Sequence, residues 1–401
     1  MKIKSRLFIA IILANLLTVF FVVSPLLAKD SIRIGFSMSL TGIYSQGAVS
    51  QMNSYKLWKE MVNEKGGIYV KDIGKKLPVE FVFYDDKSSA DTSVKVYEKL
   101  ITRDKVDLVL TPWGTIMHFA IAPLSEKYKI PMIGSTASSV KLRQLNFKYL
   151  WFVTPSLPDR QMKALSGLLK DQGIKSAAII YVQDLYPREN LDFLKPMLKK
   201  ANIKVIYEKD YPIGVKDLTT TLADIKAKNP DALLALTYPA DAFLLTGQIQ
   251  GAQLNPKLLF MLIGPTIAAY GNAFGAATEG ICSMGDWSPS LDFPGVKAFN
   301  ERYIKTFNIR PDNLDSIEAF VECQILEQAI EKAGTIDRAN IRDAIASNEF
   351  MTLRGPVRFE GTENTISPAG ILQYQKGGLE LVWPPEIATA KAVCPKPAWS
   401  K

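Results

Sequence analysis

The chain has 401 residues, with 48 Lys and Arg against 40 Asp and Glu, one His and three Cys. At roughly 150 residues per domain, this length predicts two or three domains, each large enough for its own core. The 47% hydrophobic and 22% charged fractions exclude wholesale disorder. The single histidine, His118, excludes His-rich metal sites and relays of two imidazoles, and no Cys-x-x-Cys pair occurs. We therefore predict no metal site and no cofactor.

The first 28 residues have the pattern of a secretory signal peptide. Three basic residues precede an apolar run from 7 to 23, and Ala28 is a small residue where cleavage is expected. The run is short for a membrane span, although the large Leu26 keeps an uncleaved anchor as the alternative. Removing residues 1–28 leaves 45 basic and 40 acidic residues, so the net charge falls from +8 to +5. We predict an exported, periplasmic protein.

The remaining positive charge is spread along the chain in short lysine clusters mixed with apolar residues. Such clusters are typical of solvated helix and loop faces, so we predict no nucleic-acid binding. Three cysteines in an exported chain allow at most one internal disulfide, and the sequence does not choose the pair among Cys282, Cys323 and Cys394.

From residue 31 onward, short apolar runs alternate with helical patterns, which predicts parallel sheets covered by helices. The first series has strands at 32–36, 79–84, 106–110 and 131–133, and helices that end at 66–67, 102 and 128. A second series follows two prolines and has strands at 177–182, 203–207, 232–236 and 258–263, with helices at 160–170, 191–200, 218–228 and 242–250. Two series of one pattern predict two lobes of the same α/β architecture.

The pattern changes after Gly280. Helices are predicted at 296–307, 317–333 and 338–346, followed by short antiparallel strands at 355–360, 371–375 and 379–383. No low-complexity linker separates the two series, so we expect the lobes to be joined by short connections.

Ligands of parallel sheets bind beyond the carboxyl ends of the strands, so the strand-to-helix loops are the candidate site. One loop, Trp113-Gly114-Thr115, opens a helix, and another at 134–139 is rich in small hydroxyl residues that include Ser138. Free backbone N–H groups and hydroxyls at helix starts suit a carboxylate. The alternative is that Thr115 and Ser138 only cap their helices.

The loops of the second series contribute Tyr186, Tyr238 and Thr266. Rings that face an anion-binding loop could hold a small acid with an organic side chain, although loop tyrosines are also often packing residues. Enzymatic signatures are missing: there is no phosphate-binding glycine motif and no nucleophile elbow. His118 and the Asp85-Asp86 pair are interpreted as structural. We predict that the protein is not an enzyme.

Several short stretches, each weak by itself, occur together in one order over residues 31–390. They are Ile34-Gly35-Phe36 through Leu40-Thr41-Gly42, Val62-Asn63-Glu64-Lys65-Gly66-Gly67-Ile68, Tyr84-Asp85-Asp86, Ala122-Pro123 with Ile130-Pro131-Met132, and Val382-Trp383-Pro384-Pro385-Glu386. In these stretches the chain resembles the periplasmic solute-binding proteins of the leucine/isoleucine/valine-binding type, which serve ATP-driven (ABC) uptake systems.

The resemblance implies a type I periplasmic-binding-protein fold, with two lobes, three crossings between them and closure around a ligand by hinge motion. The crossings are expected near residues 153–154, 281–282 and 353–355. The N-terminal lobe is then 29–153 with 282–353, and the C-terminal lobe is 154–281 with 354–385, followed by a tail at 386–401. The implied partners are a small-molecule carboxylate and a membrane permease, and the expected state is a monomer.

The resemblance also implies ligand-binding roles for seven residues. Thr115 and Ser138 match groups that hold the ligand carboxylate, Ala137 matches a carbonyl that receives an ammonium group, Tyr186 and Tyr238 match contributions of the second lobe, and Tyr44 with Gln46 match the side-chain pocket.

One departure bears on the ligand. Family members that bind α-amino acids commonly have a Glu where this chain has Thr266, and an ammonium group buried without a carboxylate is costly. Together with Trp113, this favours a ligand without an amine, such as a keto, hydroxy or aromatic acid. Asp85, Asp241 or Asp286 could supply the charge instead, which keeps amino acids open.

Three functional hypotheses follow from the sequence. The first is a binding protein that delivers a small carboxylate to a permease. The second is a sensor that reports the same ligand to a signalling partner, and the third is an enzyme that uses the same cleft. Since no signalling domain follows the lobes in this sequence, transport is favoured.

Overall fold

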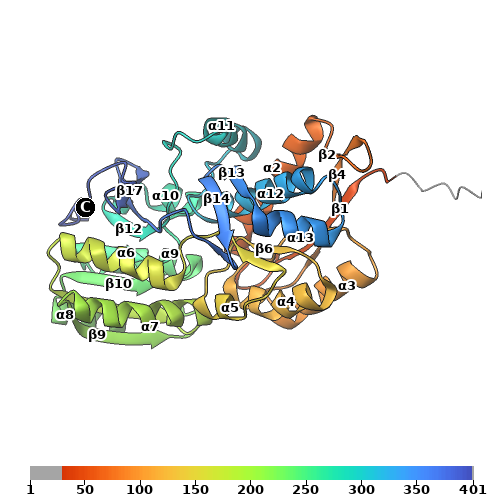
Figure 1. Cartoon of the computed structure of the whole chain (residues 1–401). Coiled ribbons are helices and arrows are strands. Elements are labelled where there is room, and N and C mark those ends of the chain that lie inside the picture. Colours follow the sequence, from red (N-terminus) through yellow and green to blue (C-terminus); the bar gives the residue numbers. More distant parts are fainter. Residues whose placement is uncertain (1–28, 400–401) are drawn as a thin grey trace, which may run out of the picture.

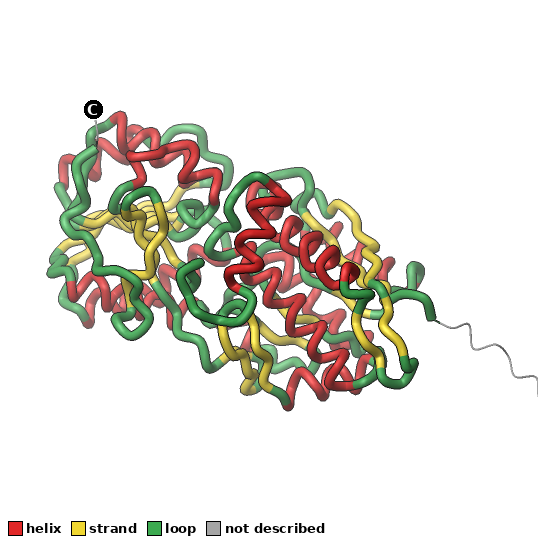
Figure 2. The backbone as a smooth tube through the Cα atoms, turned by 90° about the horizontal axis from the view of Figure 1, so that it is seen from above, coloured by secondary structure: helices red, strands yellow, loops and turns green. Residues whose placement is uncertain are grey.

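In the computed structural model, which describes residues 29–399, two α/β lobes lie side by side (Figures 1 and 2). The predicted signal peptide, residues 1–28, lies outside the described residues. None of the described helices is both long and apolar enough to cross a membrane.

The N-terminal lobe begins with elements that alternate as predicted. They are β1 (Ile32–Met38), α2 (Ser45–Glu64), β2 (Ile68–Val70), β3 (Lys75–Leu77), β4 (Val79–Asp85), α3 (Ala90–Thr102), β5 (Leu108–Val109), α4 (Thr115–Tyr128), β6 (Met132–Gly134), α5 (Val140–Gln144) and β7 (Leu150–Phe152). Strand β1 lies between β4 and β5 and is parallel to both. Its residues are almost all buried, as expected for a strand covered on both faces.

The C-terminal lobe repeats this alternation. Its elements are α6 (Pro158–Asp171), β8 (Ser176–Val182), α7 (Leu185–Lys200), β9 (Lys204–Tyr211), α8 (Thr219–Lys228), β10 (Ala232–Leu236), α9 (Pro239–Gly251), β11 (Leu258–Met261), α10 (Ala268–Phe274), the 3₁₀ turn η1 (Gly275–Thr278) and β12 (Ile281–Met284). Alternate residues of β8 enter two different apolar cores: Ala177 and Ile179 join the core under α6 and α7, and Ala178 and Ile180 join the core under α8 and α9. Helices therefore cover both faces of the sheet.

After β12 the chain returns to the N-terminal lobe and then leaves it again. The returning elements are α11 (Val296–Phe307), α12 (Asp315–Ala333), α13 (Arg338–Ser347), β13 (Glu349–Thr352), β14 (Gly355–Glu360) and β15 (Glu363–Asn364), and the final hairpin is β16 (Ile371–Gln375) and β17 (Gly378–Trp383). Helix α12 packs against α2, and both bury apolar residues in one core with β1.

Strand pairing shifts two of the three predicted crossings. Strand β12 pairs with β11 and β16, so it belongs to the sheet of the C-terminal lobe, and the second crossing lies at 285–295 instead of 281–282. Strand β14 pairs with β13 and β15, and β15 pairs with β7, so these strands stay in the N-terminal lobe. The third crossing therefore lies at 365–370 instead of 353–355. The physical reason is that backbone hydrogen bonds decide to which sheet a strand belongs. The order of helical and strand patterns along the sequence does not show with which strand each one pairs.

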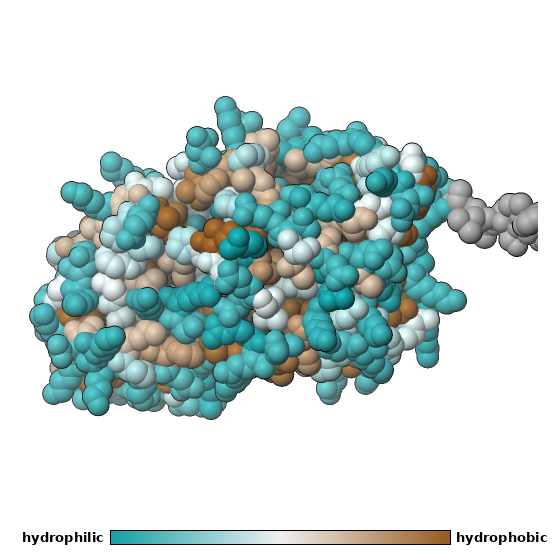
Figure 3. Space-filling view, in the orientation of Figure 1, coloured by the Kyte–Doolittle hydropathy of each residue, from teal (hydrophilic) through white to brown (hydrophobic). Residues whose placement is uncertain are grey.

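The face shown in Figure 3 is covered mostly by polar and charged side chains, with apolar residues in scattered patches on both lobes. The C-terminal tail packs on the C-terminal lobe, where Trp399 is buried and its Nε1 donates a hydrogen bond to the carbonyl of Leu254 (2.8 Å).

Candidate functional site

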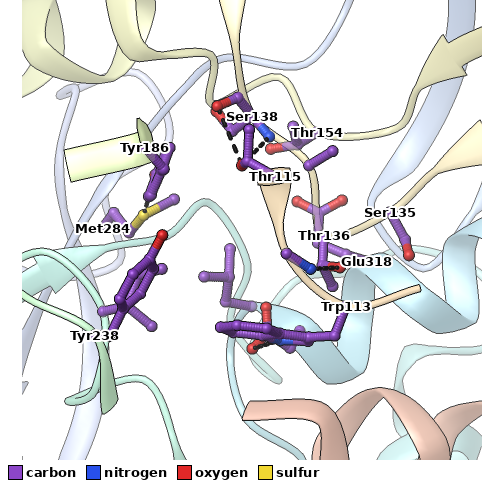
Figure 4. Close-up of a pocket in the computed structure, with 15 residues that line it drawn as sticks. Trp113, Thr115, Ser135, Thr136, Ser138, Thr154, Tyr186, Tyr238, Met284 and Glu318 are labelled. Atoms are coloured by element: carbon purple, nitrogen blue, oxygen red, sulfur yellow. Dashed lines mark hydrogen bonds between the residues drawn. The ribbon is translucent and has the colours of Figure 1, made fainter. Parts of the chain in front are cut away.

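A cavity lies between the two lobes, at the carboxyl ends of parallel strands, with an empty volume of ≈ 420 Å³ (Figure 4). This position is the one expected for ligands of open parallel sheets. The N-terminal lobe and the first crossing line it with Trp113, Gly114, Thr115, Ser135, Thr136, Ala137, Ser138, Thr154, Leu314, Asp315 and Glu318, and the C-terminal lobe lines it with Tyr186, Tyr238, Ile263 and Met284.

One corner of the cavity is formed by the start of α4. Gly114 has a φ of 95°, which glycine adopts without strain, and its N–H donates to Thr136 Oγ1 (3.0 Å). Thr115 Oγ1 accepts the N–H of Ser138 (3.2 Å), so the two predicted loops are held together. The first-turn N–H groups of a helix have no partner within the helix, and the helix dipole favours negative charge there. This corner, which we call the anion corner, is suited to a carboxylate.

The hydroxyl of Ser138 has a further partner. Its Oγ donates to the carbonyl of Ser156 in the first crossing (2.7 Å). Ser138 therefore connects the anion corner to the segment that follows β7, and its hydroxyl proton is already used in this bond.

Two acidic residues of α12, Asp315 and Glu318, also line the cavity. Glu318 forms a two-pronged ion pair with Arg354, at 2.7 and 3.0 Å, while Asp315 Oδ2 accepts the indole N–H of Trp113 (3.0 Å). Burial raises the pKa of Glu318 to about 7, against the opposing effect of Arg354. Burial and the negative charge of Asp312 raise the pKa of Asp315 well above its usual range.

Arg354 holds the hinge side of the cavity together. It is 4% exposed and pairs with Asp286, just after β12, at 3.0 Å, as well as with Glu318. Its Nη1 also donates to the carbonyl of Val153 in the first crossing (3.4 Å). One guanidinium thus connects Glu318 of α12 to the first two crossings, which are the segments about which the lobes would rotate.

The opposite wall is aromatic and apolar. Tyr186 lies in the first turn of α7, and its hydroxyl donates to Gln161 Oε1 (2.9 Å) and lies 3.1 Å from Met284 Sδ. Tyr238 directly precedes α9, and its ring faces the cavity across from Glu318 and Thr136 (Figure 4). These side chains provide apolar surface for an organic group.

Three rings separate this cavity from an outer groove. The ring centroids of Tyr44 and Trp113 are 5.5 Å apart, and each lies 6.1 Å from the ring of Tyr238. The outer groove is lined by residues 42–47 of one lobe and by 213–216 and 238–241 of the other, together with Trp113. Tyr44 Oη also donates to Asp184 Oδ2 at 3.0 Å, a bond between the lobes. The lobes are therefore in contact over the cavity.

The structure brings together seven of the ten predicted site residues around the cavity: Trp113, Gly114, Thr115, Ala137, Ser138, Tyr186 and Tyr238. Tyr44 and Gln46 lie in the outer groove, and Gln46 is exposed. Thr266 is not part of the lining: it is buried, and its carbonyl accepts the N–H of Asn313 (3.3 Å).

Sequence reasoning missed the two acids of the cavity, Asp315 and Glu318. The available signal was a pair of acids in the first turn of a helix, but the sequence does not show that this helix starts at the cleft. Of the acids considered instead, Asp85 is held by the loop at Leu40 (3.0 Å), Asp241 lies in the outer groove and Asp286 pairs with Arg354.

The other residues of chemical interest take structural positions. His118 is buried in α4, its Nδ1 lies 2.9 Å from the carbonyl of Gly114, and burial lowers its pKa to about 4. Cys282, Cys323 and Cys394 are all free thiols. Within residues 29–399, no group of three or more His, Cys, Asp or Glu side chains is arranged to hold a metal ion.

Comparison with known proteins decides the family. The model of a family described as periplasmic binding protein matches residues 31–378. The chain belongs to the periplasmic binding protein family. Among its relatives, the leucine-, isoleucine-, valine-, threonine- and alanine-binding protein of Pseudomonas aeruginosa is 25% identical over 368 residues, which cover 89% of this chain and 91% of that one.

Solved structures share the type I fold of this periplasmic binding protein. A solute-binding protein of an ABC transporter from Rhodopseudomonas palustris, in complex with benzoate, has a TM-score of 0.78 at 18% identity and covers 92% of this chain and 98% of its own. A branched-chain amino acid transporter substrate-binding protein from Streptococcus pneumoniae, in complex with isoleucine, has a TM-score of 0.77 at 20% identity and covers 91% of this chain and 100% of its own.

Proposed function

We propose that this protein is the extracytoplasmic solute-binding component of an ABC importer and that it binds a small carboxylate between its lobes. The observation that carries the proposal is the anion corner, which stands across the cavity from an aromatic wall. Helix N–H groups and the Thr115 hydroxyl would receive the carboxylate, and Trp113, Tyr186 and Tyr238 would enclose the organic part.

The relatives support this ligand class. The Pseudomonas protein is named for five amino acids, and the structures that share the fold hold isoleucine, benzoate or 3,4-dihydroxybenzoic acid. All of these ligands are small carboxylates with an organic side group. A site that binds and releases such a ligand requires no chemical step, so the proposed role is binding without catalysis. The proposed partner is the membrane permease, which a monomer in the periplasm would supply with ligand.

The test is a thermal-shift screen followed by calorimetric titration of each compound that raises Tm. The probes are L-leucine, L-isoleucine, L-phenylalanine, their 2-oxo acids, benzoate and 3,4-dihydroxybenzoate. We expect at least one carboxylate to bind, and Thr115→Val to weaken its binding by about tenfold, because one hydrogen bond near a charge is worth ~1.5 kcal/mol.

Thr102→Val is the matched control, because its hydroxyl bonds only within α3, to the carbonyl of Glu98 (2.7 Å). The Thr102→Val variant should bind the carboxylate with the same affinity as the unaltered protein. A screen in which no carboxylate raises Tm contradicts the proposed function. Equal affinity of Thr115→Val and the control removes the anion corner from the site.

A further inference from the structure

The charged side chains that line the cavity bear on which carboxylate it can bind. Of the fifteen lining residues, the charged ones are Asp315 and Glu318, and neither Lys, Arg nor His lines the cavity within residues 29–399. A ligand that carried only a negative charge would meet two acids there, of which only Glu318 is paired with a cation, Arg354. Like charges in a water-poor site are strongly unfavourable.

The two acids differ in how they are compensated. Both carboxylate oxygens of Glu318 are bonded to Arg354, so its charge is matched by a guanidinium. Asp315 has no cation among the described residues, and its single hydrogen-bond donor is the neutral indole of Trp113. Asp315 is also 4% exposed, so water compensates little of its charge.

The other groups around Asp315 increase the deficit of positive charge. Asp312 lies on the same segment and adds negative charge, and Tyr186 faces Asp315 from α7 as a neutral phenol. Arg354 is committed to Glu318 and Asp286. A buried carboxylate in such surroundings is costly unless a cation joins it.

We propose that Asp315 receives the protonated amine of the ligand, so that the site selects a small apolar amino acid over the corresponding acid without an amine. This inference rests on the proposed function, because the ligand carboxylate is taken to occupy the anion corner. It reverses the expectation drawn from Thr266. The charge that this position lacks in the C-terminal lobe is supplied from the N-terminal lobe, at the start of α12.

The proposed arrangement also assigns the rest of the ligand. With its carboxylate at the anion corner and its amine at Asp315, the side chain would lie toward Tyr238, Met284 and Ile263. These residues offer an aromatic face and two flexible or branched apolar groups, which suit an aliphatic or aromatic side chain and disfavour a charged one.

The test compares matched ligand pairs that differ in the amine. L-Leucine is paired with its 2-oxo acid, and L-phenylalanine with phenylpropionate, each titrated calorimetrically against the full mature chain. We expect the amino member of at least one pair to bind the unaltered protein about tenfold or more tightly than its partner. Asp315→Asn, which keeps an acceptor for Trp113, should weaken the amino member by about tenfold or more and change the other by less than about threefold.

Asp85→Asn is the charge-matched control, because Asp85 lies outside the cavity and is bonded to the exposed loop at residues 40–41. It should leave both affinities unchanged. Equal binding of the paired ligands to the unaltered protein overturns the inference, as does an Asp315→Asn variant that weakens both members alike. If that variant does not fold, the ligand pairs on the unaltered protein still decide. Failure of every carboxylate, benzoate included, instead contradicts the proposed function and this inference with it.

Discussion

The two walls of the cavity are built from the same backbone feature and differ in chemistry. Helices α4 and α12 of the N-terminal lobe begin at the cavity, and so do α7 and α9 of the C-terminal lobe. On the N-terminal side the first turns present Thr115, Asp315 and Glu318, which we call the polar wall. On the C-terminal side lie Tyr186, in the first turn of α7, and Tyr238, directly before α9, which we call the aromatic wall. Helix starts therefore set the place of the site, and the side chains of the first turn decide what each wall can bind.

The contacts of the two walls also differ in how much they depend on geometry. Buried polar and charged groups need partners with fixed geometry, and the N-terminal wall has them in Arg354, Thr136 and Trp113. Apolar contacts are less directional, so the aromatic wall can hold an organic group without a fixed set of partner atoms.

The largest expected effect comes from removing the cation that supports the polar wall. Arg354→Met leaves Glu318 and Asp286 buried without their guanidinium, so we expect the free energy of unfolding to fall by ~3–5 kcal/mol, as for other broken buried ion pairs. Urea unfolding measures this. Arg358→Met, which removes an exposed pair with Glu360, is the control and should change stability by less than ~1 kcal/mol. Similar values for the two variants would mean that the polar wall is not organised by Arg354.

The dependence of stability on pH tests the protonation state of Glu322, a buried acid of α12. Glu322 accepts the N–H of Thr111 (2.9 Å), its hydroxyl (3.1 Å) and the hydroxyl of Tyr55, and burial raises its pKa from 4.5 to about 8. Between these two values the folded chain holds one more proton than the unfolded chain. The contribution of Glu322 to stability is therefore complete below pH 4.5 and is lost as the pH rises through 8, by ~1.4 kcal/mol per pH unit.

Glu322→Gln keeps the size and planar geometry of the side chain and removes its titratable carboxyl group. We expect the free energy of unfolding, measured in urea at pH 5 and pH 8, to fall less with pH in this variant than in the unaltered protein. Glu318, with a pKa of about 7, acts in the same direction, so some decline should persist. Glu80→Gln, on the exposed side of β4, is the control. A slope that Glu322→Gln leaves unchanged would show that Glu322 is ionised in the folded protein.

The smallest expected effect concerns the bond between the two walls. Tyr44→Phe removes the hydrogen bond to Asp184 that joins the lobes and keeps the ring contacts with Trp113 and Tyr238. One such bond contributes ~1 kcal/mol, so we expect the carboxylate found in the ligand screen to bind about fivefold more weakly. Calorimetry measures this, with Tyr69→Phe, at an exposed tyrosine, as the control. Unchanged affinity would mean that closure depends on the rings alone.

Much of the fold could be predicted, because buried parallel strands and amphipathic helices leave strong periodic patterns. The strand at Ala232–Leu236 and the helix at Val296–Phe307 have the predicted bounds. The short strands β2, β3 and β13 were missed, since three or four residues carry too little pattern and are held by pairing with their neighbours. The first turn of α7, which contains Pro187, was predicted as part of a loop, although proline is well tolerated where a helix has no N–H bonds to lose.

By itself the sequence determined the α/β class, the two lobes, the family and the loops in which most of the cavity lies. These properties depend on residues that are near one another in the chain, where apolar spacing, helix starts and short family stretches are visible. Only the tertiary structure decided where the charge in the site comes from. Asp315 and Trp113 are 202 positions apart, and Glu318 and Arg354 are 36 apart. Trp113 and Asp315 meet because the chain returns to the N-terminal lobe at the second crossing, and Glu318 and Arg354 meet because β13, which ends just before Arg354, packs beside α12. No local pattern records which helix start then faces the ligand.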